Sequence, residues 1–98
     1  MSYLVVVSFD LTDAPSDTYQ AISQEMNDVG LRHWVVSKDN MHLDLPATTF
    51  SGEFNGESST KIRDDISNQV RGIISRHGIR SKIFISVGSE WAWGTRST

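Results

Sequence analysis

Residues 3–11 read YLVVVSFDL, and this stretch decides the fold. Residues 4–7 form an unbroken apolar run that is rich in β-branched valine. Such a run is typical of a central strand that is covered on both faces. The sequence then becomes polar at Ser8 and reaches a lone carboxylate at Asp10. An acidic side chain at the exposed end of a buried strand is the clearest indication of chemistry in this chain.

Two later stretches have the spacing of amphipathic helices. In the first, apolar residues recur three and four positions apart between Ser16, a predicted N-cap, and Gly30, a predicted C-terminal cap. In the second, the same spacing is followed by Gly78. The two stripes consist of Tyr19, Ile22, Met26 and Val29, and of Ile62, Ile66, Val70, Ile73 and Ile74.

Three further strands are predicted at residues 33–37, 48–54 and 82–87. Residues 41–45 alternate apolar and polar side chains, but Pro46 cannot donate a ladder hydrogen bond, so we treat them as an extension or bulged lead-in of the strand at 48–54. The order strand, helix, strand, strand, helix, strand predicts an α+β fold. We expect a ferredoxin-like βαββαβ sandwich, with a four-stranded antiparallel sheet in the order 4-1-3-2 and two helices on one face. Residues 1–98 then form a single domain, with a short aromatic tail at 88–98.

One face of this sheet has no predicted helix over it. Alternation along the first strand directs Val5 and Val7 to the helices, which leaves Leu4 and Val6 on the other face, together with Phe84. An apolar patch of this kind rarely faces water. A second copy of the chain, the tail with Trp91 and Trp93, or a neighbour's tail could cover it.

We favour a two-fold homodimer through this face. Its interface contains Leu4, Val6, Phe84, Trp91 and Trp93, and it brings Ser8 and Asp10 close to the same residues of the second chain. The alternative is a monomer whose tail folds back on its own sheet.

Composition excludes several classes of protein. The chain has no cysteine, which excludes disulfides, thiolate metal sites and thiol nucleophiles. No P-loop or dinucleotide fingerprint occurs, so we expect no organic cofactor. The longest apolar run is too short to cross a bilayer, so we expect a soluble, cytoplasmic protein without membrane contact.

The net charge of −3 argues against a surface covered in basic residues. Residues 61–82 are nevertheless locally basic, and this segment could contact RNA phosphates. The alternative is a solvated helix face of mixed charge. The candidate nucleic-acid contacts are Arg63, Arg71, Arg76 and Arg80.

The end of the first strand, Ser8-Phe9-Asp10-Leu11, resembles that of two groups of small proteins. It is similar to the CRISPR-associated ferredoxin-like nucleases that work with the spacer integrase, and to the antitoxin endoribonucleases of the GhoS type. The resemblance implies a symmetric dimer in which Asp10 meets its partner across the two-fold axis and can hold a divalent metal. It also implies a C-terminal segment that reaches the other subunit. The chain departs from the pattern in being acidic and in having no arginine or histidine immediately beside Asp10.

Asp10 is accordingly the candidate catalytic and metal-binding residue, with Ser8 and Asp13 as supporting residues. Mg²⁺ prefers oxygen ligands and keeps several waters, so one carboxylate from each chain can hold it. The alternative is an aspartate that ends a strand and accepts turn hydrogen bonds. The first hypothesis is therefore a dimeric, Mg²⁺-dependent endoribonuclease or antitoxin. The second is a non-catalytic dimeric module that presents a surface to a protein or nucleic acid.

Overall fold

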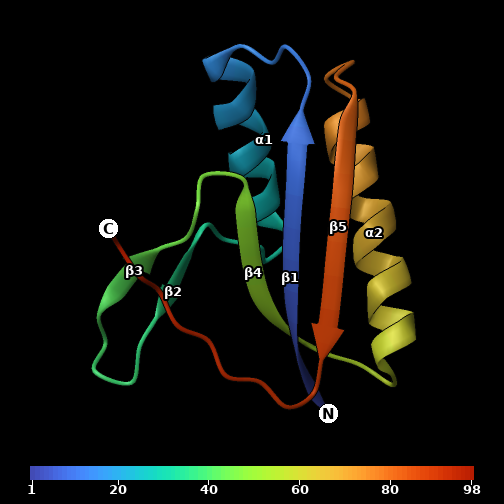
Figure 1. Ribbon diagram of the computed structural model, residues 1–98. Coiled ribbons are helices and arrows are strands. Elements are labelled where there is room, and N and C mark those ends of the chain that lie inside the picture. The colour runs from blue at the N-terminus through green and yellow to red at the C-terminus, as the bar shows by residue number, and fades with distance from the viewer.

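The computed structural model describes residues 1–98 and shows an α+β protein. A three-stranded antiparallel sheet has the long first strand at its centre, in the order β4-β1-β5, and two helices cover one of its faces (Figure 1). The bounds are β1 (Ser2–Leu11), α1 (Ser16–Asp28), β4 (Thr49–Asn55), α2 (Ser59–Ser75) and β5 (Ser81–Gly88).

The core lies between the sheet and the helices, as the alternation of β1 predicts. Val5, Val7 and Phe9 of β1 are buried and point to the helix side. Phe50 of β4 stacks on Phe9 with ring centroids 5.5 Å apart. The predicted stripe of α2 completes the same cluster together with Ile22 and Met26 of α1. Val29 packs against this cluster, as do Ile83, Ile85 and Val87 of β5, whereas Tyr19 of the predicted α1 stripe lies outside it and lines the depression beside Asp10. Burial of this apolar surface is the main force that holds β1 at the centre.

The helix ends largely follow the sequence signals. The hydroxyl of Ser58 accepts a hydrogen bond from the backbone N–H of Lys61 and so caps α2. Gly30, with φ +93°, follows the C-terminal end of α1, as predicted. The predicted N-cap of α1 is wrong by one position: Pro15 occupies it and Ser16 is already helical, because the extended backbone of Pro15 leads into the first turn.

The prediction of a four-stranded sheet in the order 4-1-3-2 is wrong at its fourth strand. β2 (Trp34–Val36) and β3 (His42–Asp44) pair with each other in a separate two-stranded sheet. Residues 41–45 are therefore not an extension of the next strand. A single bridge, between Arg32 and Ser51, links this hairpin to the edge of β4.

Pro46 explains why the hairpin separates. Pro46 lacks an N–H and cannot donate a ladder hydrogen bond. Its carbonyl oxygen accepts a hydrogen bond from the N–H of Thr49, with an N···O distance of 2.8 Å, and this bond closes a tight turn. This turn separates β3 from β4. The chain reverses between β2 and β3 at residues 37–41, where the N–H of Asn40 donates to the carbonyl of Ser37 and the N–H of Ser37 donates to the carbonyl of Met41, so β3 pairs with β2. The backbone of residues 34–36 then makes its hydrogen bonds in the hairpin, which leans away from the sheet (Figure 1).

The segment after β5 has no regular secondary structure. Figure 1 shows that it leaves the lower end of β5, passes the lower ends of β1 and β4, and ends near the hairpin. Neither helix has the length and apolar composition needed to cross a bilayer.

Candidate functional site

Asp10 lies at the exposed end of β1, as predicted. It is the register partner of Lys82 in β5. A shallow depression of about 540 Å³ lies beside it, formed by the loop after β1, the start of α1 and the turn before β4. The depression is lined by Asp10, Leu11, Ala14, Tyr19, Ala47 and Thr48.

The two supporting residues lie on either side of Asp10 in the chain. Ser8 is half-buried on the same face of β1 and is the register partner of Thr49 and Phe84 in the neighbouring strands. Asp13 is exposed in the following loop, with a φ of +56°. No three His, Asp or Glu side chains in the chain are close enough to share a metal ion.

The four candidate arginines are divided between two places. Arg63 and Arg71 are exposed on α2, on the side of the sheet opposite to Asp10, and Arg63 pairs with Asp64 at 3.0 Å. Arg76 pairs with Glu25 at 3.2 Å. Arg80 is different, because its carbonyl accepts a hydrogen bond from the N–H of Thr12, close to the Asp10 end of β1.

A mixed-charge cluster joins the two helices. Nε2 of His77 lies 2.9 Å from Oε1 of Glu25, and Arg76 approaches the other carboxylate oxygen. The hydrogen bond from His77, with a smaller contribution from Arg76, lowers the pKa of Glu25 below its ordinary value of 4.5. This cluster lies in the helix layer, so its role is to fasten α1 to the end of α2.

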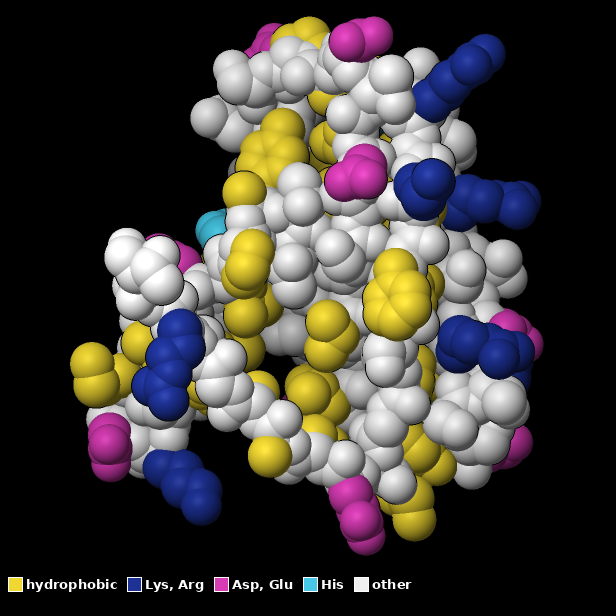
Figure 2. Space-filling model, in the orientation of Figure 1, with side chains coloured by type: hydrophobic (Ala, Val, Ile, Leu, Met, Phe, Trp, Pro, Cys, Tyr) yellow, Lys and Arg dark blue, Asp and Glu magenta, His cyan; other side chains and the backbone are white.

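The open face of the sheet is covered at one end only. Leu4 and Val6 are half-buried, and Trp91 and Trp93 of the same chain line hollows beside Leu4. The tail therefore packs on its own sheet in the structure. At the other end Phe84 is 66% exposed, beside Ser8. Figure 2 shows hydrophobic side chains over β1 and β5, and a gap between the sheet and the tail.

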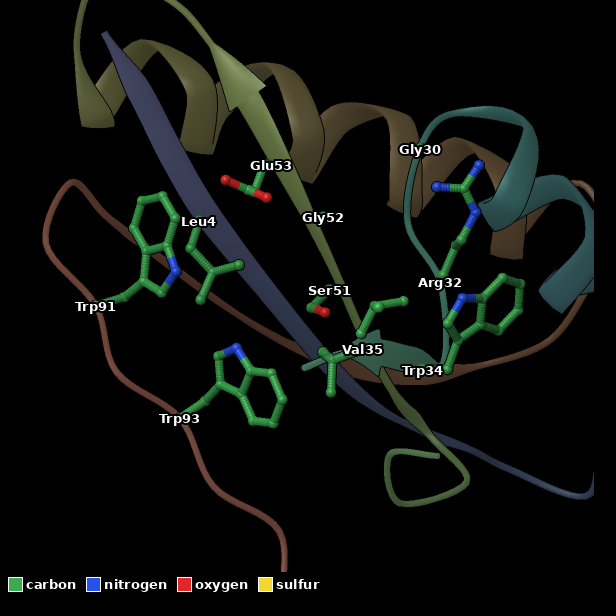
Figure 3. Close-up of a pocket in the computed structure, with 11 residues that line it drawn as sticks. Leu4, Gly30, Arg32, Trp34, Val35, Ser51, Gly52, Glu53, Trp91 and Trp93 are labelled. Carbon is green, nitrogen blue, oxygen red and sulfur yellow. The ribbon is translucent and has the colours of Figure 1, made fainter. Parts of the chain in front are cut away.

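The gap is a cavity of about 410 Å³, which we call the tryptophan hollow. Figure 3 shows its arrangement: Trp91 and Trp93 of the tail form one wall, and Arg32 and Trp34 form the opposite wall. Glu53 projects from β4 near Leu4, at the edge of the hollow, and its side chain is exposed. The guanidinium of Arg32 lies 5.7 Å from the ring centroid of Trp34, a cation–π contact. The remaining lining residues are Leu4, Gly30, Val35, Val36, Ser51 and Gly52.

The sequence does not reveal this hollow. Trp91 and Trp93 are recognisable as a hydrophobic tail, but Arg32, Trp34 and Glu53 are far apart in the chain. They come together because a bridge joins Arg32 to Ser51 of β4 and because the tail turns back from the end of β5 toward the hairpin. Two glycines of the lining, Gly30 and Gly52, are also distant in the chain but touch in the fold: the Gly30 carbonyl packs where a side chain at position 52 would lie.

Comparison with protein-family models gave no match, and neither did comparison with curated proteins.

Proposed function

We propose that this chain is a ferredoxin-like homodimer that cleaves RNA with a metal ion held at Asp10. The order of elements supports the fold assignment, with the β2–β3 hairpin in the place of the fourth strand of the sheet. The observation that carries the proposal is the uncovered end of the sheet, where Phe84 is 66% exposed beside Ser8 and Asp10.

The dimer is proposed because the tail covers only part of the open face of the sheet. The tail packs beside Leu4, so the part of the face that still needs a partner lies around Phe84. A large exposed aromatic ring on a sheet is an anchor for association, since its burial removes apolar area from water. A two-fold axis at Phe84 places Asp10 of both subunits at the same interface.

The residues at this end fit a loosely held Mg²⁺. Each chain contributes the exposed carboxylate of Asp10, and two such carboxylates with water suffice for this ion. Bound Mg²⁺ supplies an activated water and neutralises charge on a phosphodiester. Lys82, opposite Asp10, and Arg80, near Thr12, provide positive charge for the RNA backbone at the same end of the sheet.

The test is a cleavage assay with RNA and DNA in the presence of Mg²⁺. We expect the native chain to cleave RNA, and Asp10→Asn to lose that activity while its unfolding temperature is unchanged. Asp39→Asn, an exposed aspartate in the β2–β3 turn, is the matched control and keeps full activity. No cleavage by the native chain would contradict the proposal and favour a non-catalytic dimeric module.

The dimer is tested separately by sedimentation velocity. Phe84→Lys puts a charge into the proposed interface, so we expect a dimer for the native chain and a monomer for this variant. A monomeric native chain at all concentrations would contradict the two-fold arrangement.

A further inference from the structure

We propose that the tryptophan hollow is a binding site for the guanine base of a nucleotide. It lies at the Leu4 end of β1, whereas Asp10 lies at the other end, so this inference does not rest on the proposed nuclease activity. Its volume of about 410 Å³ is within the range of small-molecule sites.

The walls of the hollow provide stacking surfaces. Trp91 and Trp93 remain about two-fifths exposed, although each lines the hollow. Exposed indole faces are suited to planar aromatic ligands, and proteins that bind single-stranded nucleic acids stack bases on such side chains. The walls thus favour a nucleobase, without selecting which one.

The charged groups of the hollow are free of protein partners. Neither Glu53 nor Arg32 forms a salt bridge or a side-chain hydrogen bond, and the guanidinium of Arg32 lies over the ring of Trp34. An unpaired carboxylate and an unpaired guanidinium in one hollow can serve a ligand that carries both hydrogen-bond donors and an anion. A nucleotide combines these two features.

Glu53 selects guanine among the bases. A carboxylate is acceptor-only and can take two parallel hydrogen bonds. Guanine alone presents two adjacent donors on its Watson–Crick edge, the N1–H and the N2 amino group. Adenine and cytosine place an acceptor beside their single amino donor, and uracil flanks its one N–H with carbonyls. Arg32 on the opposite wall then binds the phosphate bidentately.

Isothermal titration calorimetry with the full-length chain tests this inference. We expect guanosine 5′-monophosphate to bind, and inosine 5′-monophosphate, which lacks the N2 amino group, to bind at least about tenfold more weakly because one charge-assisted hydrogen bond is lost. Adenosine 5′-monophosphate should bind more weakly than guanosine 5′-monophosphate by at least the same factor. Equal affinity for the guanine and adenine nucleotides, or no binding of guanosine 5′-monophosphate, would overturn the proposal.

Two variants separate recognition from stacking. Glu53→Gln replaces an acceptor-only group with an amide, so we expect it to abolish the preference for guanine, whereas Glu57→Gln, at an exposed position outside the hollow, keeps it. Trp91→Leu should weaken all nucleotides similarly, because stacking does not distinguish the bases. The tail lies outside the core, so this variant keeps the native fold. Retention of the guanine preference by Glu53→Gln would contradict the role of that carboxylate.

A second ligand distinguishes a free guanine nucleotide from a guanosine within an RNA strand. It is a five-nucleotide RNA made of adenosines with one central guanosine. Binding at least about tenfold tighter than that of the mononucleotide identifies an unpaired guanosine within a strand. Equal affinity identifies a free nucleotide as the ligand, with the terminal phosphate on Arg32.

Discussion

Nε2 of His77 lies 2.9 Å from Oε1 of Glu25, and this contact joins the segment just after α2 to the last turn of α1. Glu25 and His77 are both partly buried in the helix layer. Because the pKa of Glu25 is lowered in the folded chain, chiefly by the hydrogen bond from His77, the ionised carboxylate favours folding.

The first prediction concerns the pH dependence of this contact. The stabilisation by Glu25 is fully present above its ordinary pKa of 4.5 and is lost as the pH falls through the lower folded-state pKa. We expect Glu25→Gln to be less stable than the native chain at neutral pH, with the difference shrinking in acid. Urea unfolding at a series of pH values measures it, with Glu57→Gln as the control. A difference that is constant from neutral pH to acid would contradict this linkage.

The second prediction concerns the close approach of Gly52 to Gly30. A Cβ at position 52 would collide with the Gly30 carbonyl, and the ring of Phe54, 3.0 Å from the same position, leaves little room to relax. We expect Gly52→Ala to destabilise the chain by about 1–3 kcal/mol. Gly94→Ala, whose Cβ would meet nothing within 4 Å, should leave the urea midpoint unchanged. Equal midpoints for the two variants would show that the contact is dispensable.

The third prediction compares two serines at helix starts. Ser58 caps α2 through its hydroxyl, whereas Ser16 begins α1 without such a hydrogen bond. Ser58→Ala should therefore cost about 1 kcal/mol of unfolding free energy, and Ser16→Ala much less. Thermal unfolding of both variants, followed by circular dichroism, measures the two losses of stability. A larger loss for Ser16→Ala than for Ser58→Ala would contradict the capping assignment.

The fourth prediction concerns the tail. Deletion of residues 90–98 removes both indoles from beside Leu4, so we expect a loss of about 1–2 kcal/mol in unfolding free energy. We also expect increased self-association, because Leu4 and Val6 become exposed. Deletion of residues 95–98 alone removes no residue that lines the hollow and is the control. Equal stability of the two truncated chains would show that the tail does not pack on its own sheet.

Much of the fold could be predicted because its signals are local. The apolar alternation of β1 and the stripes of both helices recur at fixed spacings, and each identifies the side that is buried. The edge of the sheet could not be predicted in this way. Whether β2 pairs with β4 or with β3 depends on the turn at Pro46, and the same strand composition is compatible with both.

The two candidate sites also differ in whether local sequence signals could predict them. Asp10 is marked by its position at the end of an apolar run, so its exposure follows from the sequence. The hollow depends on contacts between segments that are distant in the chain. In the sequence, Glu53 is an isolated acidic residue on a predicted strand. In the fold, Trp91 and Trp93 of the tail line the same hollow as Glu53.

The placement of the indoles makes the chain its own optical probe. All three tryptophans, Trp34, Trp91 and Trp93, line the same hollow, and the core contains none. Tryptophan emission of the unlabelled chain, excited at wavelengths that tyrosine does not absorb, therefore reports on the surroundings of that hollow. A ligand that enters the hollow changes this spectrum, and the core contributes nothing to it.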